Sequence, residues 1–130
     1  MVLGFVVNLS LPYWRDHFFF MGADDANFFQ LTGGEFPKKI EPGKTHPIFT
    51  LKALPNHVGY RVCPCSSRKP FDRHHYRYIN KGCRLEFTNH EMDRNSYLVE
   101  NILLNLPPTI AIKFRFKGQV PNICLMVKKK

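Results

Sequence analysis

The chain has 130 residues, of which 44% are hydrophobic and 14% aromatic. This length suits one domain with one core, and the apolar content excludes a largely disordered chain. The formal net charge of +9 at pH 7 indicates an anionic partner, because such charge repels itself in a compact protein and attracts nucleic acid or an anionic membrane.

The chain begins with an expected strand, followed by a long stretch of irregular pattern. Residues 4–11 are apolar on both faces, and Pro12 ends this strand. Residues 13–43 include a short predicted helix at 23–31, with acidic residues near its start and Gly33-Gly34 after it. The rest of this stretch lacks a clear pattern, so residues 13–43 are predicted to be a functional insertion, either a lid or a loop that contacts a partner.

Regular alternation returns near residue 47 and predicts most of the sheet. The predicted strands are 48–53, 59–64, 75–79, 83–87 and 110–116, with a last edge strand within 120–127. Residues 96–104 fit a strand or a helix, and the start of this segment favours a strand. Turns are expected at 55–57, 81–82, 91–95 and Gly118, and residues 128–130 form a frayed basic tail. Six to eight short strands without a βαβ rhythm are typical of a mainly β, small barrel occupying residues 1–130 as one domain.

The segment 61–84 is densely basic and aromatic. Its cations are Arg61, Arg68, Lys69, Arg73, Arg77, Lys81 and Arg84, against the single acid Asp72, and Phe71, His74, His75, Tyr76 and Tyr78 lie between them. Arginine and lysine contact phosphates, while tyrosine and histidine rings offer faces on which unpaired bases stack. We therefore predict a polyanion-binding segment, with Arg68, Lys69, Arg73, His74, Tyr76, Arg77 and Arg84 as nucleic-acid-binding residues. The alternative is a solvated face whose aromatic side chains point inward.

Membrane insertion and metal binding are less well supported by the sequence than polyanion binding. In the sequence no apolar run approaches the ~20 residues that cross a bilayer, no amphipathic basic helix is apparent, and the apolar start lacks a cationic leader. The four cysteines are Cys63, Cys65, Cys83 and Cys124. Cys63-Pro64-Cys65 with His74 and His75 offers zinc ligands at a poor spacing. A chain with this apolar content needs no disulfides, so we expect reduced thiols, a cytoplasmic location, no metal and no cofactor.

Four segments in order resemble one known family. Residues 44–51 (KTHPIFTL), 60–67 (YRVCPCSS) and 95–102 (NSYLVENI) are similar to successive strand motifs of the PemK/MazF toxins, and residues 4–12 fit the family's opening strand. The order and approximate separations agree over residues 48–102, about half of the chain. The resemblance implies an SH3-like barrel, single-stranded RNA as substrate, a homodimer and an acidic antitoxin as protein partner.

The resemblance also implies a chemistry, which is metal-independent RNA cleavage through attack of the ribose 2′-hydroxyl on the adjacent phosphorus. Carried over by position, His46 stands where the family has its catalytic arginine, directly before Pro47, and Ser66 stands at the family's hydroxyl position. Histidine suits proton transfer near neutral pH, and Arg61 or Arg68 would then meet the phosphate charge. The catalytic candidates are thus His46, Ser66 and Arg61.

The chain departs from the family in three places, which keeps two other functions open. His46 replaces an arginine, residues 13–43 are longer than the family's first loop, and a strand-like 110–116 stands where the family has a C-terminal helix. One alternative is a nucleic-acid-binding barrel without catalysis. The other is a protein-interaction domain in which Phe18–Phe20 and the insertion dock a partner.

Overall fold

The sheet is built on three long antiparallel strands, β1 (Phe18–Asp24), β2 (Thr45–Ala53) and β3 (Tyr60–Ser66). β2 lies between the other two and pairs with both. The structure is a computed structural model that describes residues 13–39, 43–70, 75–107 and 114–128.

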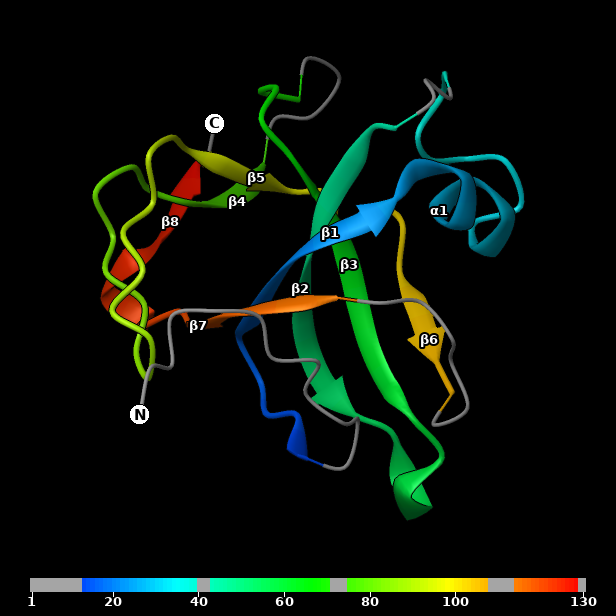
Figure 1. The fold of residues 1–130 in the computed structure, drawn as a ribbon, viewed down its shortest axis with the longest axis horizontal. Coiled ribbons are helices and arrows are strands. Elements are labelled where there is room, and N and C mark those ends of the chain that lie inside the picture. The colour runs from blue at the N-terminus through cyan, green and yellow to red at the C-terminus, as the bar shows by residue number, and fades with distance from the viewer. Residues whose placement is uncertain (1–12, 40–42, 71–74, 108–113, 129–130) are drawn as a thin grey trace.

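Shorter elements extend and cover these strands (Figure 1). They are α1 (Asp25–Leu31), η2 (Pro55–His57), β4 (Tyr76–Ile79), β5 (Ser96–Leu98), β6 (Leu104–Leu106), β7 (Arg115–Gln119), η3 (Asn122–Cys124) and β8 (Leu125–Lys128). The strand order is β7-β1-β2-β3-β5-β4-β8, with β6 also paired to β3. The described residues therefore form one curled sheet of eight strands with one α-helix, which confirms the predicted mainly β, small-barrel class.

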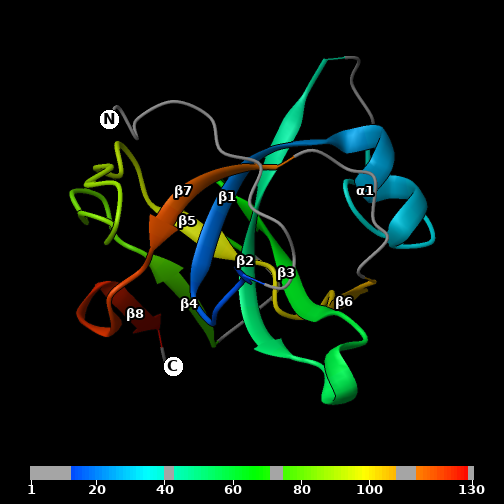
Figure 2. The same ribbon diagram turned by 60° about the horizontal axis from the view of Figure 1, so that its bottom comes forward.

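The three long strands are buried on both faces, because two apolar clusters lie on opposite sides of them. Successive side chains of a strand point to opposite faces, so Phe18 and Phe20 join one cluster while Phe19 joins the other. The helix-side cluster contains Trp14, Phe18, Phe20, Ala23, Phe28, Ile48, Tyr60, Val62, Leu104, Leu106 and Phe114. The thiol-side cluster contains Phe19, Phe49, Cys63, Cys65, Ile79, Cys83, Leu85, Met92, Leu98 and Val120. Figure 2 shows α1 and β6 on one side of the molecule and β4 and β8 on the other.

Residues 13–43 are predicted to be irregular apart from one short helix, but the strand β1 lies within them. Phe18, Phe19 and Phe20 are at most 4% exposed, so they belong to the core and do not dock a partner. A strand buried on both faces shows a continuous apolar run instead of alternation, which is why the pattern was not recognised. The helix predicted at 23–31 is confirmed and begins at Asp25.

Other predicted boundaries also change. Residues 83–92 make a narrow hairpin held by the bridge Arg84↔Glu91, in place of the strand predicted at 83–87. Gly118 lies inside β7 and not at a turn. The segment 96–104 starts as the strand β5, as expected, then turns before β6. The predicted strand at 4–11 and most of the one at 110–116 lie outside the described residues. Within the described part of the chain, no helix has the length and hydropathy needed to span a membrane.

A disulfide joins Cys83 to Cys124, so the prediction of reduced thiols is wrong for these two residues. The backbone brings the pair together, because the N–H of Asn80 donates to the Cys124 carbonyl and the N–H of Cys83 donates to the Asn80 carbonyl. The bond therefore fastens the start of the 83–92 hairpin to the segment before β8. Cys63 and Cys65 are free and buried. The cytoplasmic location was inferred from reduced thiols and loses that support.

We predict that reduction of the Cys83–Cys124 bond lowers the free energy of unfolding by about 4 kcal/mol, the value that chain entropy gives for a loop of 41 residues. Urea unfolding with and without reductant measures the change. The double variant Cys83→Ser with Cys124→Ser should be insensitive to reductant. Protein refolded under oxidising conditions should show two titratable thiols when denatured, and four would contradict the assignment.

We predict that Gly118→Ala destabilises the protein by about 3 kcal/mol or more, because of steric overlap and an unfavourable backbone. Gly118 has φ of +130°, and an added Cβ would lie 2.6 Å from Leu85 Cβ and 2.7 Å from the Glu86 carbonyl oxygen. Gly33→Ala is the matched control, since its φ is also positive but no atom lies within 4 Å of the added Cβ. Thermal unfolding of both variants measures the difference, and equal losses would contradict close packing at Gly118.

Candidate functional site

His46 and Asp25 form a close pair where β2 begins. His46 Nδ1 lies 2.5 Å from Asp25 Oδ1, and the two side chains are 24% and 3% exposed. Because a carboxylate only accepts hydrogen bonds, Nδ1 carries the hydrogen and donates it. The pair therefore joins a buried carboxylate to an imidazole that reaches solvent.

Local structure explains why these two residues meet. The side chain of Asp24 caps α1 by accepting the Ala26 N–H, so Asp25 is the first residue of the helix. The backbone N–H of Asp25 donates to the Lys44 carbonyl, and Ala23 on β1 pairs with His46 on β2. The start of the helix and the start of β2 are thus fastened together by their backbones.

A second contact orients the imidazole ring. The ring of Phe36 meets that of His46 edge to face, with centroids 4.9 Å apart. Phe36 is itself held by Thr32, whose hydroxyl accepts the Phe36 N–H at 2.9 Å and lies 3.0 Å from the Phe36 carbonyl oxygen. With Nδ1 bonded to Asp25 and Phe36 against the ring, Nε2 remains the nitrogen that can accept a proton, which is the arrangement of a general base.

Figure 1 shows that β3 ends near the place where β2 begins. Ser66 is the last residue of β3 and His46 is the second residue of β2. The β2–β3 register pairs Ile48 with Pro64, and two further residues along each strand reach His46 and Ser66. Along its other edge β3 pairs with β5, where Ser66 lies opposite Tyr97. The Ser66 hydroxyl accepts the N–H of Arg68 at 3.1 Å, so it bonds within its own loop and not to His46.

Arg61 lies at the other end of β3 and is not brought to His46. It pairs with Lys52 and with Asn105, and its Nε donates to Asn105 Oδ1 at 3.1 Å. Five residues of strand separate Arg61 from Ser66, a distance of roughly 17 Å. Of the two arginines proposed for the phosphate charge, Arg68 is the one beside Ser66.

The predicted nucleic-acid-binding residues do not share one environment. Arg68 and Lys69 are exposed, whereas Arg73 and His74 lie outside the described residues. Arg77 binds Glu100 through two bonds of 2.7 and 3.2 Å, which raise the pKa of Arg77, and Arg84 pairs with Glu91 at 2.9 Å. Tyr76 is 9% exposed and packs against Tyr78 and Tyr97. The segment is therefore not a uniform binding face.

The two free cysteines are buried, and His74, one of the histidines considered beside them, lies outside the described residues. Cys63 and Cys65 both face the thiol-side cluster, as strand alternation predicts, but burial raises the pKa of both thiols and favours the neutral form. Cys83 is bonded to Cys124. Among the described residues no three His, Cys, Asp or Glu side chains are grouped to hold a metal ion.

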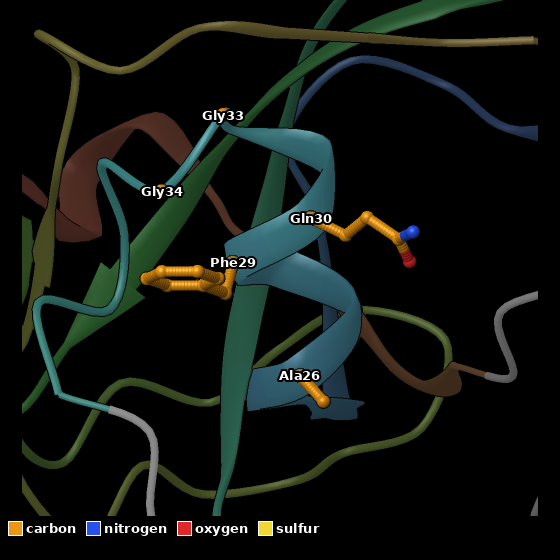
Figure 3. Close-up of a pocket in the computed structure, with 5 residues that line it drawn as sticks. All are labelled: Ala26, Phe29, Gln30, Gly33 and Gly34. Carbon is orange, nitrogen blue, oxygen red and sulfur yellow. The ribbon is translucent and has the colours of Figure 1, made fainter.

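A shallow hollow beside α1 is separate from this pair (Figure 3). It is lined by Ala26, Phe29, Gln30, Gly33 and Gly34. Figure 3 shows the Phe29 ring beside Gly34, while Gln30 points away from them. The lining contains neither an acid, a base nor a nucleophile, so we do not assign chemistry to it.

Two residues of interest were missed by sequence reasoning. The pattern predicts Asp25 only as a charge at a helix start, although an acid beside a helix cap can also turn inward, as it does here. It predicts Tyr97 only as part of a strand. Comparison of the chain with protein-family models, curated proteins and solved structures finds no match. The resemblance to the PemK/MazF family therefore stays a prediction.

We predict that Asp25→Asn lowers the free energy of unfolding by about 1–3 kcal/mol, because it replaces a buried, charge-assisted hydrogen bond. Asp24→Asn is the matched control at the neighbouring position, since asparagine also caps helices, and its effect should be small. Urea unfolding compares the variants. Equal stability of Asp25→Asn and Asp24→Asn would contradict the assigned pair.

Proposed function

We propose that this protein binds single-stranded RNA and cleaves it without a metal ion, with His46 as the general base. The observation that carries the proposal is the His46–Asp25 pair, with Nδ1 bonded at 2.5 Å and the ring 24% exposed. The net charge of +9 and the resemblance of residues 44–51 and 60–67 to a ribonuclease family support RNA as the substrate.

The proposed step begins at the ribose 2′-hydroxyl. Nε2 of His46 takes the hydroxyl proton, and the 2′-oxygen forms a bond to the adjacent phosphorus. The bond from phosphorus to the 5′-oxygen breaks, and that oxygen takes a proton from water. The hydroxide so formed takes the proton back from the His46 imidazolium, which restores the base. The products are a 2′,3′-cyclic phosphate and a 5′-hydroxyl end. Asp25 would stabilise the imidazolium formed on His46, and Arg68 would meet the charge growing on the phosphoryl oxygens.

An unstructured RNA incubated with the pure protein tests the proposal, with and without EDTA. We expect cleavage in both conditions, products that end in a cyclic phosphate, and a loss of about 10²–10⁴-fold in rate for His46→Ala, typical of a removed general base. Asp25→Asn should cleave more slowly than wild type while RNA binding is retained. Asp24→Asn should cleave at the wild-type rate.

The control for contaminating nuclease is His46→Ala purified in the same way. If wild type and His46→Ala cleave equally, or if neither cleaves, the enzyme proposal is wrong. RNA retention would then be the remaining property to measure.

A second candidate is a binding barrel without catalysis. The position of Arg61 favours it, since its Nε is bonded to Asn105 at the far end of β3 from His46. This protein would retain RNA in a salt-dependent manner and never cleave it, because phosphate contacts weaken as salt rises. An acidic protein partner and a homodimer are further proposals that the family resemblance adds.

A further inference from the structure

Four neighbouring strands present one row of side chains on the face away from the thiol-side cluster. Ser66 on β3 pairs with Tyr97 on β5, Tyr97 pairs with Tyr78 on β4, and Tyr78 pairs with Met126 on β8. Residues next to this row, such as Cys65, Leu98 and Ile79, belong to the thiol-side cluster. Since neighbouring residues on a strand point to opposite faces, the row lies on the outer face of the sheet.

Three tyrosine rings meet on this outer face. Tyr78 and Tyr97 have ring centroids 5.3 Å apart, and Tyr76 lies 6.2 Å from Tyr78 and 5.8 Å from Tyr97. Tyr76 is buried, whereas Tyr78 and Tyr97 are partly exposed. The Asn95 amide, whose oxygen accepts the Lys81 N–H, lies 3.4 Å from the Tyr97 hydroxyl. The two partly exposed rings thus pack against a third, buried ring.

Positive charge lies at both ends of the row. Lys128 on β8 pairs with Tyr76 and is exposed. Arg68 and Lys69 follow Ser66 and are exposed as well. Arg77, which alternates with the tyrosines along β4, is neutralised by Glu100. Aromatic rings flanked by exposed cations suit the binding of single-stranded nucleic acid. Its unpaired bases can stack on the rings, while Lys and Arg contact its phosphates.

We infer that Tyr78 and Tyr97, supported by Tyr76, form a stacking platform for the bases of single-stranded nucleic acid. The strand would cross the outer face between Lys128 and the Arg68–Lys69 end. The inference rests on the proposed binding of single-stranded RNA and is independent of cleavage. Ser66 belongs to both proposed sites. It is the first residue of this row, and it ends β3 near the proposed cleavage site.

Two oligonucleotides of equal length test the platform, one of 2′-O-methyl RNA, which resists 2′-hydroxyl attack, and one with an abasic backbone of equal charge. Wild type should bind the base-bearing strand more tightly by about tenfold or more. Tyr78→Ala with Tyr97→Ala should remove that preference, and the corresponding Phe variants should keep it. Lys128→Ala should weaken binding to both strands alike. Tyr13→Ala is the matched control, because Tyr13 is exposed and belongs to none of the strands.

A second measurement on unaltered protein covers the case in which the double variant does not fold. Nitration of tyrosines, located by mass spectrometry, should be slowed at Tyr78 and Tyr97 by the base-bearing strand and unchanged at Tyr13. If wild type binds neither oligonucleotide, the proposed RNA binding is wrong. If it binds both equally and nitration is unchanged, RNA binding stands and the platform is wrong. Protection of the two tyrosines by a neutral oligosaccharide, and not by the base-bearing strand, would also overturn it.

Discussion

The fold depends on β3, because this strand has neighbours along both of its edges. Along one edge it pairs with β2 from Tyr60 to Pro64, and along the other it pairs first with β6 and then, at Cys65 and Ser66, with β5. Proline has no N–H to give to a neighbouring strand, so the second edge lacks a donor at Pro64, between the two pairings. The Pro64 carbonyl accepts the N–H of Val99, at 2.9 Å, just after β5. Pro64 therefore lies where β5 takes over from β6 along this edge, while β2 occupies the other.

The course of β3 determines where chemistry can lie. Its two faces contribute to both apolar clusters, and Arg61 and Ser66 lie near its two ends. Arg61 and Ser66, close in sequence, are therefore separated by most of the length of the strand. At the Ser66 end, the pairing with β5 places Tyr97 beside the start of the loop that carries Arg68. The basic segment is thereby divided between a core strand, a loop and the outer face of β4.

Much of the fold could be predicted from the sequence wherever local alternation of polar and apolar residues, or a turn, marked a strand. The strands within 48–53 and 59–64 were found because polar and apolar residues alternate or turns bound them. β1 was missed because Phe18, Phe19 and Phe20 are buried on both faces and show no alternation. The Cys83–Cys124 pairing could not be predicted, since it depends on a three-dimensional approach across 41 residues.

The candidate site was predictable only in part, for related reasons. His46 could be selected because its segment resembles a ribonuclease motif, but its partner Asp25 is 21 residues away, and only the closure of α1 onto β2 brings them together. The separation of Arg61 from Ser66 follows from β3 itself, which extends to Ser66 beyond the predicted end at residue 64, since five steps along a strand span roughly 17 Å. Residues selected from a motif in the sequence can therefore lie too far apart to form one active site.

The His46–Asp25 pair has features that a purely structural contact does not need. The corner between α1 and β2 is already fastened by the Asp25 N–H to the Lys44 carbonyl and by the pairing of Ala23 with His46. Burying a carboxylate costs free energy that an apolar residue of similar volume would not. What the carboxylate adds is a fixed hydrogen on Nδ1 and a fixed ring direction, with Phe36 against the ring. Those are requirements of proton transfer at Nε2, and this is why the pair, more than the net charge, supports a catalytic site.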